Sequence, residues 1–155
     1  MRIAVSRCLL GEPCRYDGVS KPHDAVRELA EREDVELVGV CPEVAGGLPT
    51  PRPPAELCDG RAMTADGSDV TDAYLRGASI ECARAIEAGV ELAILKERSP
   101  SCGARFVYDG THSGKLVEGE GVFARMLAER GVEVMDEDEW AATSHWKSGR
   151  STPRI

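Results

Sequence analysis

The sequence contains no apolar run long enough to form a membrane-spanning helix, so we expect no membrane-embedded segment. It also lacks an excess of positive charge, because 19 Lys and Arg residues stand against 27 Asp and Glu residues, a formal net charge of −8. A protein this acidic repels phosphate backbones at long range, which argues against a nucleic acid polymer as its partner. Residues 1–6 lack the apolar core of a signal peptide, which predicts a cytoplasmic protein.

The chain has 155 residues, of which 42% are hydrophobic and 30% are charged, a composition typical of a globular domain. A chain of this length hides roughly 68–70% of its unfolded surface on folding, which is enough for one core. We predict a single domain over residues 1–143. Residues 144–155 are basic and polar, and we predict that they form a flexible C-terminal tail.

Short apolar runs alternate with segments of helical spacing along the chain. The predicted strands are 3–6, 35–40, 90–96 and 132–135, with a further short strand at 61–64. Residues 106–108, followed by Asp109-Gly110, predict a hairpin or an extended excursion. The predicted helices are 22–32, 71–88 and 121–130, followed by a short acidic helix near 136–142. Residues 46–54 hold two glycines and four prolines, which predicts a fixed loop. The alternation predicts an α/β fold: a mostly parallel, Rossmann-like sheet with helices on both faces.

Six cysteines are present, but a disulfide framework is not expected in a cytoplasmic chain of this length. No Cys-x-x-Cys pair occurs, which disfavours a thiol-redox protein. Cys82 lies in a segment of helical spacing and is predicted to be a packed core thiol. Cys58 stands before the turn signal Asp59-Gly60, and we interpret it as structural.

Cys8, Cys41 and Cys102 each follow a predicted strand. In a parallel sheet these three strand ends open at the same edge, so the thiols are expected to meet in one cleft. Converging thiolates repel one another unless a cation replaces their protons, so the pattern predicts a metal site, either zinc or an iron–sulfur cluster. Three protein ligands leave one coordination position open, as in reactive sites. Cys14 either supplies a fourth ligand or braces the loop beside residues 15–18.

Polar residues in the same loops are candidates for chemistry. Glu43, two residues after Cys41, is a candidate general acid or base. Ser99 and Ser101, next to Cys102, are candidate hydrogen-bond donors to a substrate. Lys96 and Arg52 are suited equally to binding an anion and to forming a salt bridge.

Four motifs in these loops resemble those of the thiouracil desulfurase family. They are SRCLLG at 6–11 with CRYDG at 14–18, CPE at 41–43 with GGLPTPRPPAE at 46–56, Lys96 with SPSCG at 99–103, and YDGT at 108–111 with SG at 113–114. The similarity spans residues 2–139, nearly the whole chain.

The resemblance implies an enzyme that hydrolyses a C–S bond without net redox change. It implies that a small thiolated nucleobase similar to 2-thiouracil, or a related thioamide, loses its sulfur as sulfide. It also implies a [4Fe-4S] cluster held by Cys8, Cys41 and Cys102, with a fourth iron free to bind the substrate's sulfur as a Lewis acid. The family's acid/base glutamate matches Glu43, and its substrate-contacting serine matches Ser99, with Ser101 beside it.

A second hypothesis is a non-catalytic zinc or iron–sulfur binding module in which Cys14 closes the site as the fourth ligand. Under this hypothesis Cys14→Ala costs as much metal as Cys8→Ala, and Glu43→Gln changes no chemistry. Under the desulfurase hypothesis the metal depends on Cys8, Cys41 and Cys102.

Overall fold

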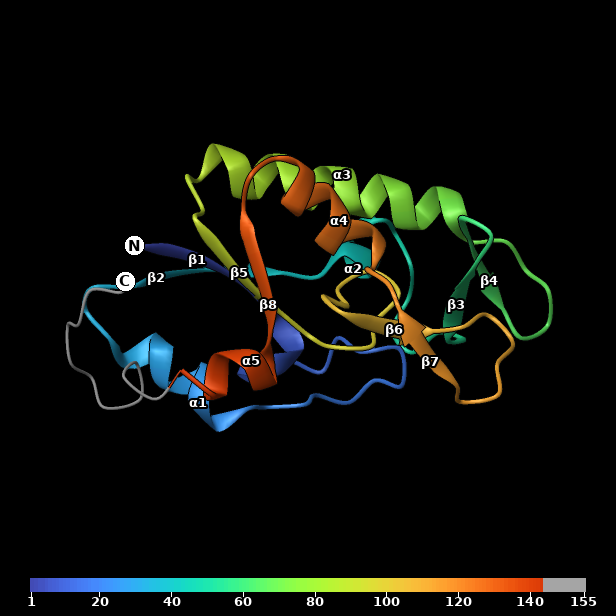
Figure 1. Ribbon diagram of the computed structural model, residues 1–155, viewed down its shortest axis with the longest axis horizontal. Coiled ribbons are helices and arrows are strands. Elements are labelled where there is room, and N and C mark those ends of the chain that lie inside the picture. Colours follow the sequence, from blue (N-terminus) through green and yellow to red (C-terminus); the bar gives the residue numbers. More distant parts are fainter. Residues whose placement is uncertain (144–155) are drawn as a thin grey trace.

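Four parallel strands form the central sheet of the computed structural model, which describes residues 1–143 (Figure 1). The sheet has the order β2-β1-β5-β8 and consists of β1 (Arg2–Ser6), β2 (Glu36–Val40), β5 (Leu92–Leu95) and β8 (Glu133–Asp136). Every neighbouring pair is parallel. The predicted α/β fold with a mostly parallel sheet is therefore confirmed.

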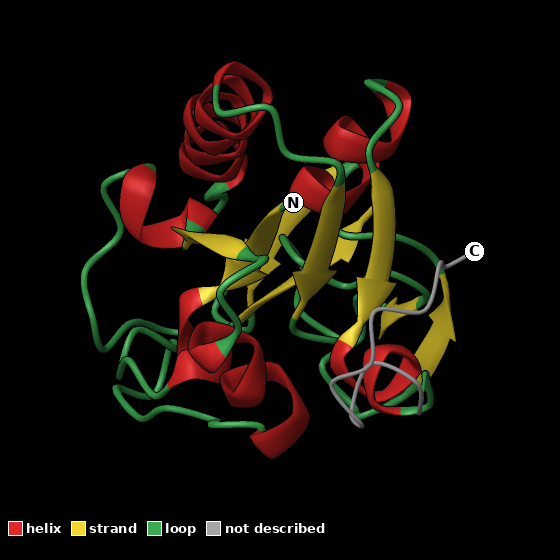
Figure 2. Ribbon diagram, turned by 90° about the vertical axis from the view of Figure 1, so that its left-hand side faces the viewer, coloured by secondary structure: helices red, strands yellow, loops and turns green. Residues whose placement is uncertain are grey.

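Helices cover both faces of this sheet, as Figures 1 and 2 show. One face carries α3 (Thr71–Glu87) and α4 (Val122–Glu129), and the other carries α1 (Asp24–Arg27) and α5 (Glu137–Ala141). Successive side chains of a strand point to opposite faces. Ala93 and Leu95 therefore pack in the core with α3 and α4, whereas Leu92 and Ile94 pack in the core on the side of α1 and α5.

The helix predicted over 22–32 starts later and changes type. It comprises α1 and then a 3₁₀ helix, η2 (Glu28–Glu31). The amides of Lys21 and His23 donate to the carbonyls of Cys8 and Leu9, both at 3.0 Å. These bonds hold the segment before α1 extended against the 3₁₀ helix η1 (Arg7–Leu10), so helical turns begin only at Asp24.

Two small antiparallel pairs extend the domain beyond the sheet. The sequence predicted β4 (Arg61–Thr64) but not its partner β3 (Ala55–Cys58). The excursion predicted near 106–108 is a hairpin of β6 (Phe106–Tyr108) and β7 (Leu116–Glu118). The predicted C-terminal tail, residues 144–155, lies outside the described residues. Within residues 1–143, no helix has the length and apolar character needed to cross a membrane.

The short helix α2 (Pro42–Ala45) was not predicted, and glycines allow it to approach α3 closely. A Cβ atom added at Gly77 on α3 would lie 1.7 Å from the carbonyl oxygen of Pro42. A Cβ atom at Gly46 would lie 2.1 Å from the carbonyl oxygen of Ala73. Backbone therefore meets backbone at this crossing, and the crossing fixes where the side chains of α2 point.

The order of the strands creates a switch point at one edge of the sheet. Numbered among themselves, the strands run 2-1-3-4, so the chain leaves β1 toward β2 on one side and returns to β5 on the other. In doubly wound sheets, ligands bind outside the carboxyl ends of the strands at such a point. A ligand site is therefore expected among the loops after β1, β2 and β5.

Candidate active site

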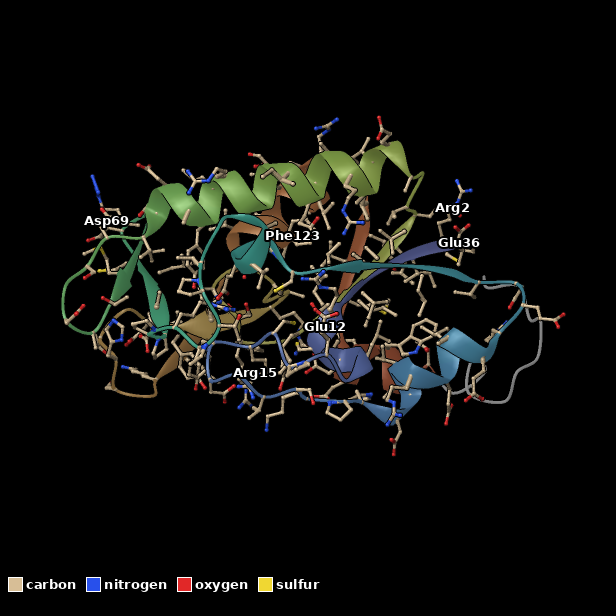
Figure 3. The ribbon with its side chains drawn as sticks, turned by 180° about the vertical axis from the view of Figure 1, so that it is seen from behind. Arg2, Glu12, Arg15, Glu36, Asp69 and Phe123 are labelled. Atoms are coloured by element: carbon tan, nitrogen blue, oxygen red, sulfur yellow. The ribbon has the colours of Figure 1, made fainter. Side chains whose placement is uncertain are left out.

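A cavity of about 650 Å³ lies among the loops that follow β1, β2 and β5. This volume is within the usual range of small-molecule sites. Its wall includes every site residue predicted from the sequence: Cys8, Cys41, Glu43, Ser99, Ser101 and Cys102. Arg15, labelled in Figure 3, comes from the loop after β1 and also lines the cavity.

Four of the six cysteines line this cavity, and all four are buried: Cys8, Cys14, Cys41 and Cys102. Cys41 directly precedes α2, and Cys102 belongs to the core that packs against α3 and α4. The other three belong to the core on the opposite face of the sheet. The thiols thus approach the cavity from both layers of the domain.

The two remaining cysteines are not among the cavity-lining residues. Cys82 is 2% exposed on α3, which confirms the prediction of a packed thiol. Cys58, the last residue of β3, is exposed and so is not packed in a core. The chain therefore holds a natural contrast between thiols that face the cavity and thiols that do not.

The surroundings of Cys41 and Cys102 favour the protonated form of their thiols. Burial raises the pKa of Cys102 to about 12, although hydrogen bonds from Ser6 and Ser101 lower it in part. The pKa of Cys41 is raised by its hydrogen bond with Cys14 and by burial. Thiols in such a place bind a cation by exchanging their protons for it, and sulfur ligands suit zinc or iron. The donor set therefore fits a metal group.

The spacing of ligand atoms bears on which group fits. A tetrahedral zinc ion with Zn–S bonds of about 2.3 Å requires its sulfurs about 3.8 Å apart. In the described part of the chain, the one set of three candidate ligand atoms within 4.8 Å of one another is Glu97, Asp136 and Asp138, which contains no cysteine. No three cysteine sulfurs of the described residues all lie within this limit, although the Cys14 thiol forms hydrogen bonds with the thiols of Cys8 and Cys41.

Glu43 is buried at the start of α2, where both of its carboxylate oxygens accept hydrogen bonds. Arg52 Nε donates to Oε1 at 2.9 Å, and Ser101 Oγ donates to Oε2 at 2.7 Å. Burial raises the pKa of the nearby Tyr74 hydroxyl, and the negative charge of Glu43 raises it further. A carboxylate held on both oxygens beside the cavity has a defined position for proton transfer.

The two serines organise the loop after β5. Ser99 Oγ accepts the amide protons of Ser101 and Cys102, at 3.1 Å and 3.0 Å. The two serine hydroxyl oxygens lie 3.1 Å apart. Ser99, Ser101 and Glu43 therefore form one connected polar chain, which reaches Cys102 through the loop backbone.

The structure places both cationic candidates in ion pairs. Arg52 pairs with Glu43, and Lys96 Nζ lies 3.3 Å from an oxygen of Glu137. Both also line the cavity. Of the two roles that the sequence left open, the salt bridge is the one that the contacts support.

Glu81 is a site-supporting residue that the sequence reasoning missed. It is buried on α3, accepts the amide proton of Cys41 at 2.8 Å and pairs with Arg84. A signal was present, because Glu81 lies four residues after Gly77 on the buried stripe of the helix. A charge on a core-facing stripe needs a partner, although the spacing does not identify that partner as Cys41.

The β6–β7 hairpin supplies part of the wall, through Tyr108 and His112. Glu56 on β3 holds the hairpin turn, because its Oε1 accepts the amide protons of Gly110 and His112, both at 3.0 Å. The motif that contains Tyr108 therefore belongs to the same site as the three cysteine loops.

Comparison with known proteins agrees with this site. The family model described as 2-thiouracil desulfurase matches residues 3–139. The chain is 42% identical over 147 residues to the uncharacterized protein YbbK of Bacillus subtilis (strain 168), covering 88% of this chain and 96% of that protein. It is also similar to a solved structure of the [4Fe-4S]-dependent thiouracil desulfidase TudS, with a TM-score of 0.86 and 41% identity, over 96% of this chain and 99% of that one. Since the family model spans every loop of the cavity, the chain belongs to the 2-thiouracil desulfurase family and is an enzyme.

Proposed function

We propose that this enzyme removes the sulfur of a small thiolated nucleobase, such as 2-thiouracil or a related thioamide, by non-redox hydrolysis of the C–S bond. The observation that carries the proposal is one cavity lined by buried thiols from the three strand ends and by the Glu43–Ser101 pair. The similar solved structure is that of a [4Fe-4S]-dependent thiouracil desulfidase, which supports the same substrate class and cofactor here.

In this proposal Cys8, Cys41 and Cys102 hold a [4Fe-4S] cluster. When bound through three cysteines, the cluster supplies an iron with a free position, a Lewis acid that suits a soft sulfur atom. Cys14 is close to this set, since Cys41 Sγ donates to the Cys14 carbonyl oxygen at 3.9 Å. We assign Cys14 to bracing the loop: its carbonyl accepts a hydrogen bond from Arg52, and its thiol forms hydrogen bonds with the thiols of Cys8 and Cys41.

The protein's own residues handle protons and orientation. Glu43 takes a proton from the water that attacks the carbon bearing sulfur, and it returns protons to the departing group. Ser101 keeps one oxygen of Glu43 in place, and Ser99, which also lines the cavity, orients the substrate. The carbon keeps the oxygen of water, the sulfur leaves as hydrogen sulfide, and no electron is exchanged with an outside donor.

The test is anaerobic reconstitution with iron and sulfide, followed by iron analysis and by sulfide release from 2-thiouracil and a small thiopyrimidine panel. We expect about four irons per chain, as a cubane cluster requires, and release of sulfide from at least one member of the panel. A reconstituted protein without iron, or one with a full cluster and no release from any member, would overturn the proposal.

Cysteine variants sharpen the same test. Cys41→Ala is expected to abolish cluster binding, and the matched control Cys82→Ala is expected to leave it intact, because Cys82 is packed outside the cavity. Cys14→Ala distinguishes a cluster held by three cysteines from a site closed by Cys14 as the fourth ligand. Retention of the cluster in this variant supports three ligands, whereas loss equal to that of Cys8→Ala supports the closed four-ligand site.

A further inference from the structure

Arg52 has an unusual number of partners for a residue in a loop of four prolines. Its side chain is 5% exposed and forms four hydrogen bonds. Nε donates to Glu43 at 2.9 Å, Nη2 donates to the Cys14 carbonyl at 3.0 Å, and Nη1 donates to the Pro49 carbonyl at 3.2 Å and to Thr50 Oγ1 at 3.0 Å. Three separate segments therefore meet on one guanidinium.

From these contacts we infer that Arg52 is a positioning residue, which fixes the Glu43 carboxylate relative to the loop that carries Cys14. The inference rests on the proposed function, in which Glu43 transfers protons. Arg52 lies at the cavity wall, but its donors are directed to protein atoms in each of these contacts. It acts on the reaction through Glu43 and not by binding the substrate.

The geometry of the Glu43 carboxylate supports this role. Its two oxygens are held from opposite sides, Oε1 by Arg52 and Oε2 by Ser101. Removing either donor leaves the other as a single pivot about which the carboxylate can turn. In the described part of the chain, Arg52 is the one cation that forms an ion pair with Glu43, so it also offsets the buried negative charge.

Arg52 also joins two loops that are far apart in the sequence. Its backbone amide donates to the Tyr16 carbonyl at 2.7 Å, two residues from the Cys14 carbonyl that its side chain reaches. Two bonds from one residue hold the 14–16 segment against the 49–52 segment. A lysine cannot replace this arrangement, because an ammonium lacks the planar fork that reaches Glu43 and a carbonyl at fixed angles.

The test compares Arg52→Lys and Arg52→Gln in the reconstituted enzyme, with kcat and KM normalised to iron content. We expect kcat to fall about 10- to 100-fold in both, as is typical when a supporting residue of a metal site is lost, with KM changed less than about threefold. Arg125→Lys is the matched control, because Arg125 also donates to a carboxylate, that of Glu129, but lies on α4 and is not among the cavity-lining residues. Its kcat is expected to stay within about twofold of the wild type.

A second readout does not depend on turnover. In the cluster-free protein, the effects of Arg52→Gln and Glu43→Gln on the melting temperature are expected to be non-additive, because the two side chains are in contact. The effects of Arg125→Gln and Glu43→Gln are expected to add, because Arg125 pairs with Glu129 on α4 and shares no partner with Glu43. If Arg52→Gln does not fold, the double-mutant cycle of positions 52 and 43 is measured with Arg52→Lys instead, which keeps a positive charge beside the buried carboxylate.

Several results would overturn the inference while leaving the proposed function standing. These are full recovery of kcat in Arg52→Lys, a change confined to KM, or additive melting effects of Arg52 and Glu43. An inactive wild-type enzyme that holds its cluster would instead overturn the proposed function, whatever the melting cycle reports. The two failures are therefore distinguishable.

Discussion

The amino and carboxyl ends of the parallel strands, which form two opposite edges of the central sheet, differ in how far their polar groups are exposed to water. At the amino ends of the strands, Arg2 on β1 pairs with Glu36 on β2, and their side chains are 52% and 68% exposed. At the carboxyl ends, Glu43 and Arg52 pair with side chains 11% and 5% exposed. Figure 3 shows Arg2 and Glu36 at one end of the molecule, remote from Arg15 at the cavity. The same scaffold thus carries a solvated edge and a dehydrated one.

The exposed and the buried ion pair also differ in how much they contribute to the free energy of unfolding. An exposed pair contributes about 0–1 kcal/mol, because water solvates both charges almost as well. Breaking a buried pair costs about 3–5 kcal/mol, because the remaining charge is left without a partner. In the proposed function the buried pair positions Glu43 for proton transfer, whereas no role in the reaction is proposed for the exposed pair.

The most severe test of the contrast is Glu43→Gln. The amide keeps the size of the carboxylate but cannot accept a proton from water, so kcat is expected to fall about 10²- to 10⁴-fold. Iron content is expected to stay at the wild-type level, since Glu43 is not a proposed ligand. Steady-state sulfide release, normalised to iron, measures the effect.

Glu118→Gln is the control, because Glu118 is an exposed residue at the end of β7. Its kcat is expected to be unchanged. A Glu43→Gln enzyme as fast as this control would remove Glu43 from proton transfer and would leave the buried pair with a purely structural role.

The second test targets the crossing that places Glu43. Gly77→Ala sets a Cβ 1.7 Å from the Pro42 carbonyl oxygen, so α2 must move away from α3. We expect a loss of about 3 kcal/mol of unfolding free energy, the upper range for overpacking, together with reduced activity. Urea denaturation measures the loss.

Ser79→Ala, on the exposed face of the same helix, controls for changes in helix propensity. Its stability is expected to change by less than about 0.5 kcal/mol. If Gly77→Ala is as stable as this control, the close approach of α2 to α3 is not required.

Comparison of the two edges also shows what the sequence can predict. Cys8, Cys41 and Cys102 could be placed together because each follows an apolar run, and parallel strands bring their carboxyl ends to one edge. Glu43 and the serines lie in the same loops and follow from that placement. These predictions depend on topology, which alternating strands and helices specify.

Contacts that depend on packing could not be predicted in the same way. Glu81 reaches Cys41 across 40 positions, and Arg52 reaches the Cys14 carbonyl across 38. Helix α2 has only four residues, too few to give a periodic signal, and its position depends on two glycines. Such details are fixed by which backbones meet, and a single sequence does not encode them as a pattern.

The third test concerns the support of Cys41 from behind the cavity. Glu81→Gln keeps one acceptor for the Cys41 amide but removes the charge that pairs with Arg84. Loss of a buried, charged hydrogen bond is expected to cost about 1–3 kcal/mol of stability. Cluster loss to a chelator, followed by absorbance, is expected to be about tenfold faster than in the wild type.

Glu87→Gln on the same helix is exposed and is the matched control for both measurements. Equal rates of cluster loss in the two variants would mean that the Glu81 contact does not support Cys41. Equal stabilities would mean that the buried pair with Arg84 contributes no more than a surface charge.

The smallest effect is expected at the solvated edge. Arg2→Ala removes the pair with Glu36 and the bond from Arg2 Nη1 to the Ala88 carbonyl, which lies 2.9 Å away. Because Arg2 and Glu36 remain accessible to water, we expect a loss of about 0.5 kcal/mol, less at high salt, and unchanged iron content and kcat. Urea denaturation at two ionic strengths measures it. A loss comparable to that of Gly77→Ala would show that the amino edge is as tightly constrained as the carboxyl edge, and burial would then no longer distinguish the edge that performs the chemistry.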